Sequence, residues 1–277
     1  MDISFCSDAS LTIPLAAVCT TVLSAFTFRA RVGGMWDVII RALRNPLDYL
    51  PVIIRRTLIL QETIQESSDT YSFIFKPKRP CTWKAGQHGI FMFKDRTISG
   101  KFWRPFSIAS SAHEGVIRIT TIIKAEPSDF KKNLLALKPG DAFLMQGPFG
   151  EFHTSRRISR IVGIAGGIGI TPFRALLRDI TLGVIPHTEI TLIYSAIETY
   201  TFQNEIAQWE KHPAVTVIYT HTPEEVNAAL DAQVKEKGNS AAYFISGSPG
   251  MIGAIRGRLK AAGIRKIVND TFKGYLI

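Results

Sequence analysis

A glycine-rich segment between an apolar stretch and a helix-like stretch is the strongest chemical signal in this sequence. Residues Gly166–Pro172 read GGIGITP and follow the apolar stretch Arg160–Ala165. Glycine lets the backbone approach a phosphate, and the start of a helix offers unpaired N–H groups and a positive dipole end. Pro172 suits the first helical turn, where its missing N–H would have no partner. We therefore predict a nucleotide-phosphate site. A tight strand-to-helix turn is the alternative, because GxGxxP departs from the GxGxxG fingerprint at its sixth position.

Three shorter segments carry side chains suited to a flat, charged ligand. Arg104–Ser107 (RPFS) combines a guanidinium that can pair with a pyrophosphate, an aromatic ring and a hydroxyl. Ser246–Met251 (SGSPGM) follows an expected parallel strand, and ligands bind at the carboxyl ends of such strands. Asp270–Tyr275 (DTFKGY) places two aromatic rings near the end of the chain. Taken alone, RPFS is better explained by a surface arginine, a core phenylalanine and a strand-end serine.

Composition limits the classes of protein to consider. The chain has 277 residues, of which 46% are hydrophobic and 20% charged, which predicts about two folded domains rather than disorder. Three cysteines and six scattered histidines supply neither a disulfide framework nor a metal-ligand spacing, so we expect no metal. The net charge of +10 favours an acidic partner or a membrane surface. No basic run with interleaved aromatic residues occurs, so we expect no nucleic acid partner.

Two patterns of secondary structure must position these segments. Short apolar stretches separated by turn residues predict an antiparallel barrel or sandwich, with one helix at Ser128–Leu137 N-capped by Ser128. Its strands are expected at Ile53–Leu60, Thr70–Phe75, Gly89–Phe93, Phe106–Ser110, Val116–Lys124 and Ala142–Gln146. Strands and helices then alternate, which predicts a parallel sheet covered on both faces. Its strands are expected at 160–165, 189–194, 215–219, 242–246 and 267–269, and its helices at 172–179, 202–211, 224–235 and 251–262.

The first fifty residues form a segment of a different kind. Leu11–Phe28 contains 18 residues without a charge, near the lower limit of a membrane span, and arginines follow it. The positive-inside rule then places the protein at the cytoplasmic face of the membrane, held by this single anchor. The alternative is a helix packed on the folded part of a cytoplasmic protein. Met35–Arg44 is amphipathic, which suits either the membrane interface or packing on a domain.

Taken in order, these segments resemble the ferredoxin–NADP reductase superfamily of flavoenzymes. RPFS, GPFGEF (Gly147–Phe152), AGGIGITP, SGSPGM and the aromatic tail keep the family's order between about Pro51 and Tyr275. Within this superfamily, the pattern of motifs is most similar to that of bacterial single-chain NAD(P)H:acceptor reductases. The resemblance implies an α+β two-domain fold, with a six-stranded antiparallel FAD barrel followed by an α/β parallel-sheet NAD(P)-binding domain. The expected division is an N-terminal helical segment 1–50, the barrel 51–156 and the α/β domain 157–277.

The resemblance also implies roles for individual residues. Arg104 would hold the FAD pyrophosphate, Phe106 would flank the isoalloxazine, and Ser107 would lie near the flavin atom that accepts hydride. Phe272 would cover the flavin until the nicotinamide displaces it, and Ser107, Ser246 and Phe272 form the predicted catalytic set. The other predicted cofactor-binding residues are Pro105, Lys124, Ser128 and Lys131 for FAD, and Gly166, Gly167, Gly169, Thr171, Pro172, Glu198, Gly247 and Met251 for the nicotinamide dinucleotide.

Three departures from the family's pattern affect these expectations. The FAD-phosphate helix usually starts with Ser or Thr after an aromatic residue, whereas Lys131 follows Phe130 here. Phosphate binding would then rest on Ser128, Lys131 and backbone groups. Ser246 stands where the family commonly has Cys, which implies slower hydride transfer. The segment ending at Glu198 has no Arg or Lys for a 2′-phosphate, which favours NADH over NADPH.

Three functions remain as hypotheses at this point. The first is an enzyme that moves hydride from NAD(P)H to FAD and then passes electrons to a separate acceptor. That acceptor would be an acidic ferredoxin- or flavodoxin-like protein, or a membrane quinone. The second is a non-catalytic flavin- or nucleotide-binding subunit or sensor of an electron-transfer complex. The third is an α/β nucleotide-binding protein without flavin, which would leave Arg104–Ser107 unexplained.

Overall fold

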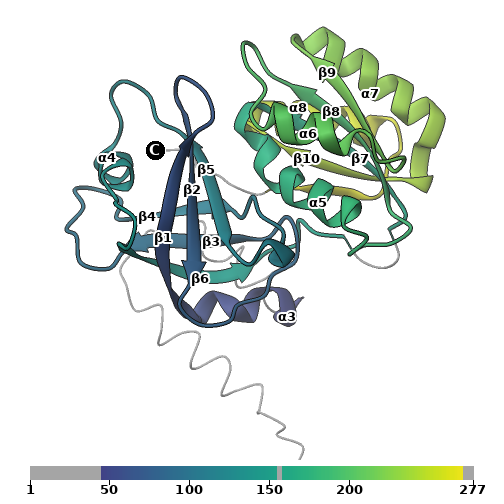
Figure 1. Cartoon of the computed structure of the whole chain (residues 1–277). Coiled ribbons are helices and arrows are strands. Elements are labelled where there is room, and N and C mark those ends of the chain that lie inside the picture. The colour runs from purple at the N-terminus through teal and green to yellow at the C-terminus, as the bar shows by residue number, and fades with distance from the viewer. Residues whose placement is uncertain (1–44, 155–157, 271–277) are drawn as a thin grey trace, which may run out of the picture.

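The computed structural model describes residues 45–154 and 158–270 (Figure 1). The expected anchor at 11–28, the amphipathic stretch at 35–44 and Phe272 lie outside these residues. Within the described ranges, no helix combines the length and apolar character needed to cross a membrane.

The first half of the described chain is a six-stranded antiparallel sheet in the order β4-β3-β6-β1-β2-β5. The two edge strands, β4 and β5, come together and close the sheet into a barrel. At this closure the backbone N–H of Ala109, just after β4, donates to the Arg118 carbonyl on β5 at 2.8 Å. Helix α4 (Asp129–Leu135) packs Phe130 and Leu134 onto the barrel core. The strands are β1 (Arg55–Gln65), β2 (Thr70–Pro77), β3 (His88–Phe93), β4 (Trp103–Ser107), β5 (Ile117–Ile122) and β6 (Ala142–Phe149).

Aromatic residues on the inner face of the strands fill this barrel. The Phe143 ring lies 5.3 Å from the Phe75 ring, 5.9 Å from Phe91, 5.0 Å from Phe93 and 6.2 Å from Phe130, measured between centroids. Phe75, Phe91, Phe93 and Phe143 meet in the interior because strand side chains alternate between faces, and Phe130 reaches them from helix α4.

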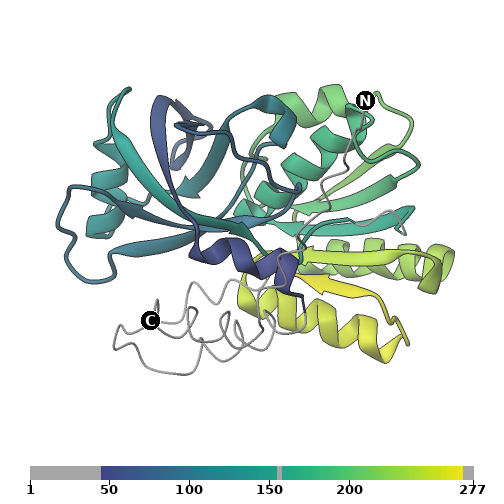
Figure 2. The ribbon, with the colours of Figure 1, turned by 90° about the horizontal axis from the view of Figure 1, so that it is seen from below.

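A short N-terminal element closes one side of the barrel. Helix α3 (Pro46–Tyr49) and the 3₁₀ turn η1 (Leu50–Ile53) lie against β6, as Figure 2 shows. The rings of Tyr49 and Phe149 are 6.1 Å apart, and Val52 completes this small apolar cluster.

The second half is a five-stranded parallel sheet in the order β11-β10-β7-β8-β9, with helices on both faces (Figure 2). One face packs on α5 (Thr171–Thr181) and α6 (Gln203–Trp209), and the other on α7 (Pro223–Lys237) and α8 (Pro249–Ala261). The strands are β7 (Arg160–Gly166), β8 (Glu189–Ser195), β9 (Val215–Thr220), β10 (Ala242–Ser246) and β11 (Ile267–Asn269).

The order of these strands creates a crevice. The chain runs outward from β7 through β8 to β9 and then returns to β10 on the other side of β7. Ligands of open α/β sheets bind at such a switch point, outside the carboxyl ends of the strands. The glycine-rich segment follows β7 and the SGSPGM segment follows β10, so both lie at this crevice.

The two halves share an apolar contact. The Phe152 ring, which follows the barrel, lies 5.3 Å from Phe173 of α5 and 5.1 Å from Phe244 of β10. Gly86 lies beneath it with φ +92°, and a Cβ there would lie 1.8 Å from the Phe152 carbonyl oxygen. Only glycine satisfies both the positive φ and this close approach.

The predicted fold class is confirmed, although several strand ends differ. Strand β1 continues to Gln65 rather than Leu60, because it pairs with β2 beyond a bulge between Leu60 and Glu62. The strand expected at Phe106–Ser110 instead spans Trp103–Ser107, in register with β3. Strand β5 ends at Ile122, so Lys124 lies beyond the strand that it was expected to end.

The packing of Phe143 predicts a large stability effect. Phe143→Ala should lower the free energy of unfolding by about 3–5 kcal/mol, because it removes a ring enclosed by four others. The matched control is Phe102→Ala, since Phe102 is 49% exposed and its loss should cost less than about 0.5 kcal/mol. Urea unfolding measures both variants, and equal effects would contradict the described barrel core.

Candidate functional site

The glycines after β7 and β10 bring two loops into close contact. A Cβ on Gly169 would lie 2.3 Å from the Ser246 carbonyl oxygen, so a side chain cannot fit there without displacing backbone. Cβ atoms on Gly166 and Gly247 would lie 2.3 and 2.9 Å from the Met251 sulfur. These four predicted site residues and Ser246 therefore form one packed unit.

Gly167 differs from its neighbours because it faces open space. Its φ is +53°, and a Cβ there would meet no atom within 4 Å. The turn that it starts leads directly into α5, where Pro172 occupies the first helical turn as expected. The Thr171 hydroxyl donates to the Ile168 carbonyl at 3.1 Å, which fixes the end of the turn. The chain thus passes from a strand through a glycine turn that is open on one side into the start of a helix. This arrangement favours the binding of a phosphate group.

The buried carboxylate of Asp270 connects the two halves of the candidate site. It accepts hydrogen bonds from the Ser107 hydroxyl at 2.9 Å and from the Ser246 hydroxyl at 3.4 Å. Ser107 ends barrel strand β4, and Ser246 ends β10 of the parallel sheet. The backbone N–H of Asp270 donates to the Ile245 carbonyl at 2.9 Å, which places the residue directly after β11. The structure therefore brings together two predicted catalytic serines that are 139 positions apart in the chain.

Sequence reasoning missed Asp270, because it assigned the tail only aromatic roles. The signal that could have found it is a lone carboxylate directly after the last expected strand, at the carboxyl edge where the other motifs end.

A cluster of cations lies on the barrel side. The Arg104 guanidinium lies 5.3 Å from the centre of the Phe130 ring and donates to the carbonyls of Lys101 and Trp103. Lys131 donates its ammonium to the Ile122 carbonyl at 2.6 Å. Burial lowers the pKa of Arg104. Burial, and then the charges of Arg104 and Lys124, lower the pKa of Lys131, with Asp69 opposing them.

The two pKa directions have different causes: burial alone disfavours the charged form of Arg104, whereas burial and neighbouring positive charges disfavour that of Lys131. A lowered pKa on a cationic group means that its charged form is disfavoured by burial or by like charges. An anion placed between Arg104 and Lys131 would relieve both effects. Ser128 stands at the N-cap of α4 without a side-chain hydrogen bond to the helix, so its hydroxyl is not used for capping.

The remaining predicted FAD-side residues pack against the barrel. The Phe106 ring lies 5.7 Å from Phe91 and 6.2 Å from Phe130, and it is half-buried, as is Pro105. Lys124 is exposed. Phe106 therefore packs against the barrel core and remains partly exposed.

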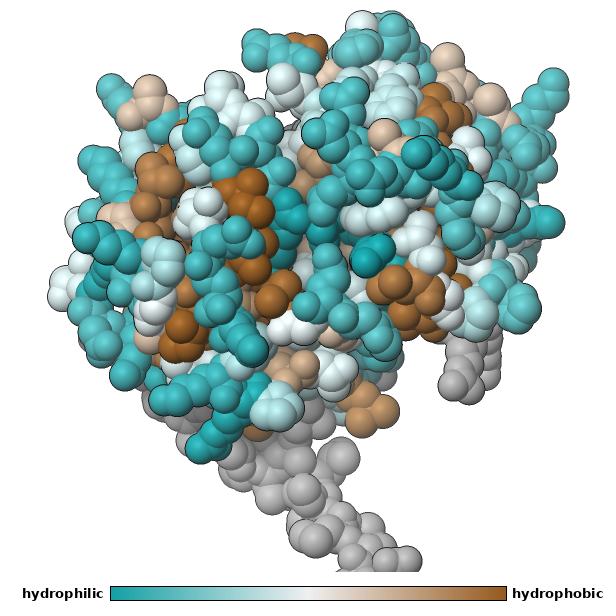
Figure 3. Space-filling model, in the orientation of Figure 1, coloured by the Kyte–Doolittle hydropathy of each residue, from teal (hydrophilic) through white to brown (hydrophobic). Residues whose placement is uncertain are grey.

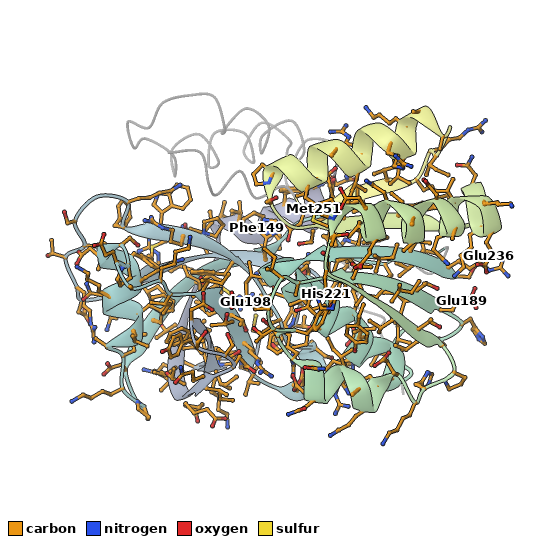
Figure 4. All side chains as sticks on the ribbon, turned by 90° about the horizontal axis from the view of Figure 1, so that it is seen from above. Phe149, Glu189, Glu198, His221, Glu236 and Met251 are labelled. Carbon is orange, nitrogen blue, oxygen red and sulfur yellow. The ribbon has the colours of Figure 1, made fainter. Side chains whose placement is uncertain are left out.

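The segments that follow the carboxyl ends of β8 and β9 carry polar side chains but no Arg or Lys. Glu198 is exposed, and the His221 ring nitrogen Nδ1 lies 3.1 Å from the Ala196 carbonyl oxygen. Segments 195–202 and 220–225 contain carboxylates but no Arg or Lys. In Figure 4, Glu198, His221 and Met251 lie toward the barrel, whereas Glu189 and Glu236 lie at the opposite end of the parallel sheet.

Comparison with known proteins agrees with this geometry. Residues 164–257 match the family model described as the oxidoreductase NAD-binding domain. The chain is 27% identical over 235 residues to flavohemoprotein A of Dictyostelium discoideum, covering 76% of this chain and 58% of that protein. It is 25% identical over 218 residues to a subunit of the Na⁺-translocating NADH-quinone reductase of Psychrobacter cryohalolentis, covering 67% and 52%. The chain thus spans somewhat more than half the length of these relatives.

A solved structure shares the fold across both halves. The cytochrome b5 reductase domain of Ulva prolifera nitrate reductase aligns with a TM-score of 0.66 and 22% identity, covering 78% of this chain and 97% of that domain. The barrel and the parallel sheet therefore occur together in both proteins.

The contact at Gly169 generates a test of the crevice. Gly169→Ala should lower the free energy of unfolding by about 1–3 kcal/mol, because its methyl group must push the Ser246 backbone aside. Gly253→Ala, in the exposed interior of α8 where a Cβ meets no atom, should instead raise it by about 0.5–1 kcal/mol. Thermal unfolding distinguishes the two, and a neutral Gly169→Ala would mean that the loops are further apart.

Proposed function

We propose that this chain is a flavin-dependent NAD(P)H:acceptor oxidoreductase of the ferredoxin–NADP reductase superfamily, which its ordered motifs resemble and whose NAD-binding domain matches residues 164–257. The observation that carries the proposal is the Ser107–Asp270–Ser246 contact, in which one carboxylate holds a barrel hydroxyl and a hydroxyl of the parallel sheet. When bound, FAD accepts hydride from NAD(P)H and gives electrons to an acceptor.

The FAD side of the proposal rests on the cation cluster. Arg104 and Lys131 would bind the FAD phosphates, since an anion would offset the burial that lowers both pKa values and the like charges that also lower the pKa of Lys131. Ser128 and Lys124 border the same region of the chain and would add a hydroxyl and a further positive charge. Phe106, with Pro105 before it, would present the accessible part of its ring to the isoalloxazine.

The nicotinamide side rests on the crevice. The open side of Gly167 and the start of α5 would receive the dinucleotide phosphates, with Gly166, Gly169, Thr171 and Pro172 shaping the turn. Gly247 and Met251 would line the nicotinamide.

The negative charge of the Asp270 carboxylate would stabilise the oxidised nicotinamide. A nicotinamide ring becomes positively charged when it gives up hydride, and a fixed carboxylate nearby lowers the free energy of that product. Ser107 and Ser246 orient the carboxylate through their hydroxyls. Phe272, two residues further along the chain, would cover the flavin face.

We propose NADH as the preferred reductant. A 2′-phosphate needs a basic partner, whereas a free 2′-hydroxyl suits a carboxylate such as Glu198. The segments at the ends of β8 and β9 carry Glu198, Glu224 and Glu225 without an Arg or Lys.

The acceptor in this proposal is a separate molecule. A net charge of +10 suits an acidic ferredoxin- or flavodoxin-like protein. A membrane quinone is the other candidate, and residues 11–28 would then hold the protein at the cytoplasmic face of the membrane. One matched relative is named as part of an NADH-quinone reductase, which supports including quinones among the acceptors to test.

Anaerobic titration of the purified protein tests the function directly. After incubation with FAD, the visible absorbance of bound flavin should bleach on addition of NADH, and more slowly with NADPH. Protein that binds FAD but is reduced by neither nucleotide would be a binding subunit or sensor instead. Protein that cannot take up FAD would refute the role given to Arg104 and its neighbours.

The cation cluster predicts how FAD affinity changes. Arg104→Gln or Lys131→Gln should weaken FAD binding roughly tenfold to a hundredfold, the range for losing a hydrogen bond to a charged group. Lys132→Gln is the control, because Lys132 is on the same helix but exposed. Fluorescence titration measures each dissociation constant. Equal affinities for all three variants would place the FAD phosphates elsewhere.

A further inference from the structure

A buried ionic cluster crosses the seam between the barrel and the parallel-sheet half. Figure 3 shows hydrophilic residues along this seam, on the face that Figure 1 presents. Arg174 of α5 is 3% exposed, and Arg118 of β5 is 8% exposed, counting side chains. Glu205 of α6 lies between them and accepts hydrogen bonds from both guanidinium groups.

Arg174 uses its whole guanidinium in this cluster. Nε and Nη2 donate to the Glu205 carboxylate at 2.9 and 2.6 Å. Nη1 and Nη2 donate to the Glu114 carboxylate at 3.0 and 3.1 Å, and Nη1 also donates to the Ala109 carbonyl at 2.8 Å. These five contacts match the five N–H donors of an arginine. Glu205 shares the helical side of the seam with Arg174, whereas Glu114 and Ala109 belong to the barrel.

The barrel partners are themselves fixed. Glu114 accepts a hydrogen bond from the Ser111 backbone N–H at 2.7 Å, as part of a capping box. Arg118 donates to the Ser72 hydroxyl at 3.1 Å and forms an ion pair with Glu66. If Arg174 moved relative to the barrel, its hydrogen bonds to Glu114 and to the Ala109 carbonyl would therefore break, because these groups are held by the barrel.

Aromatic rings cover the two buried arginines of the cluster, while the side chains of Glu205 and Glu114 remain 35% and 21% exposed. The Phe202 ring centre lies 4.6 Å from the Arg118 guanidinium and 5.5 Å from that of Arg174, and Trp209 is also 5.5 Å from Arg174. Phe202 is buried and has φ +65°, a backbone conformation that a bulky residue rarely adopts. Such a conformation persists where the surroundings hold it in place.

The cluster lies a few residues from both halves of the candidate site. Ala109, whose carbonyl accepts from Arg174, is two residues after Ser107. Arg174 is three residues after Thr171, at the start of the helix that follows the glycine turn. The Ala109–Arg174 hydrogen bond thus links the strand that carries Ser107 to the helix that begins at the crevice.

We propose that Arg174, Glu114, Glu205 and Arg118 form an arginine clamp that fixes the distance between the two halves of the site, with Arg174 as a positioning residue for hydride transfer. This inference rests on the proposed function. Buried ion pairs are often no more stabilising than apolar residues of similar volume, so net stability does not account for this cluster. Directional bonds do set orientation, and a misplacement of about 1 Å between reacting groups can cost a hundredfold in rate.

The test compares Arg174→Lys with Arg178→Lys on the same helix. Lysine keeps the positive charge but cannot form the fork that joins Glu114 to Glu205. Arg178 is one turn further along α5 and half-buried, and it forms no ion pair within the described part of the chain, so it serves as the matched control. Both full-length proteins are loaded with FAD and mixed rapidly with NADH while flavin absorbance is followed.

The clamp predicts that loss of Arg174 changes the rate of flavin reduction but not the affinity for FAD or NADH. Arg174→Lys should slow flavin reduction about tenfold or more, while the dissociation constants for FAD and NADH stay within about twofold. Amide hydrogen exchange should rise on both sides of the seam, at 109–114 and at 202–206. Arg178→Lys should change none of these quantities. Glu205→Gln, which keeps the side-chain volume, replaces Arg174→Lys if the latter fails to fold.

Two results would overturn the clamp. One is faster hydrogen exchange in Arg174→Lys with an unchanged rate of flavin reduction, since the cluster would then only stabilise the fold. The other is exchange that rises on one side of the seam alone. If even the unmodified protein is not reduced by NADH or NADPH, the proposed function fails, and the exchange pattern alone decides whether the clamp joins the two halves.

Discussion

The hydrogen bonds to the buried Asp270 carboxylate are the interaction on which the rest of the site depends. They come from the Ser107 hydroxyl on the barrel and the Ser246 hydroxyl on the parallel sheet, two sheets that share no strand. A buried carboxylate costs free energy unless hydrogen bonds compensate for the water that it has lost. The two hydroxyls and the carboxylate therefore hold one another in place, and they connect the barrel to the parallel sheet at the crevice.

Two further contacts join the halves, one apolar and one ionic. The Phe152 ring packs edge-on against Phe173 and Phe244, and this apolar burial favours association without setting a direction. The forked hydrogen bonds of Arg174 are directional, because a planar guanidinium matches a carboxylate in only a few orientations. Apolar contact thus brings the halves together, and the ionic contact fixes how they are rotated and spaced.

The sequence predicted the elements better than the contacts between them. The short apolar stretch of β2 and the glycine turn before α5 are local patterns, and both elements are found where these patterns indicate. The end of β5 was misplaced, because residues up to Lys124 continue an apolar stretch whose pairing with β2 stops at Ile122. Local periodicity carries no information about where a partner strand ends.

The residues that sequence reasoning missed act over long distances in the chain. Glu205 meets Arg118 from 87 positions away, and Asp270 meets Ser107 from 163 positions away. A charged residue in a predicted helix is expected to be solvated, and only the packed structure shows that Arg174 is buried. The one local hint was its place beside Phe173, within the most apolar turn of α5.

The local distribution of charge, rather than the net charge of +10, explains how the proposed site could discriminate between ligands. On the barrel side, Arg104 and Lys131 offer positively charged side chains, and burial lowers the pKa of both. On the parallel-sheet side, the backbone N–H groups around Gly167 would bind the phosphates in the proposed site, and the nearby segments at the ends of β8 and β9 carry carboxylates. Backbone groups can accept a pyrophosphate there, but an additional phosphate beside Glu198 would meet a like charge. In the proposed site, selectivity between NADH and NADPH would therefore come from the sign of a few side chains at one edge of the sheet.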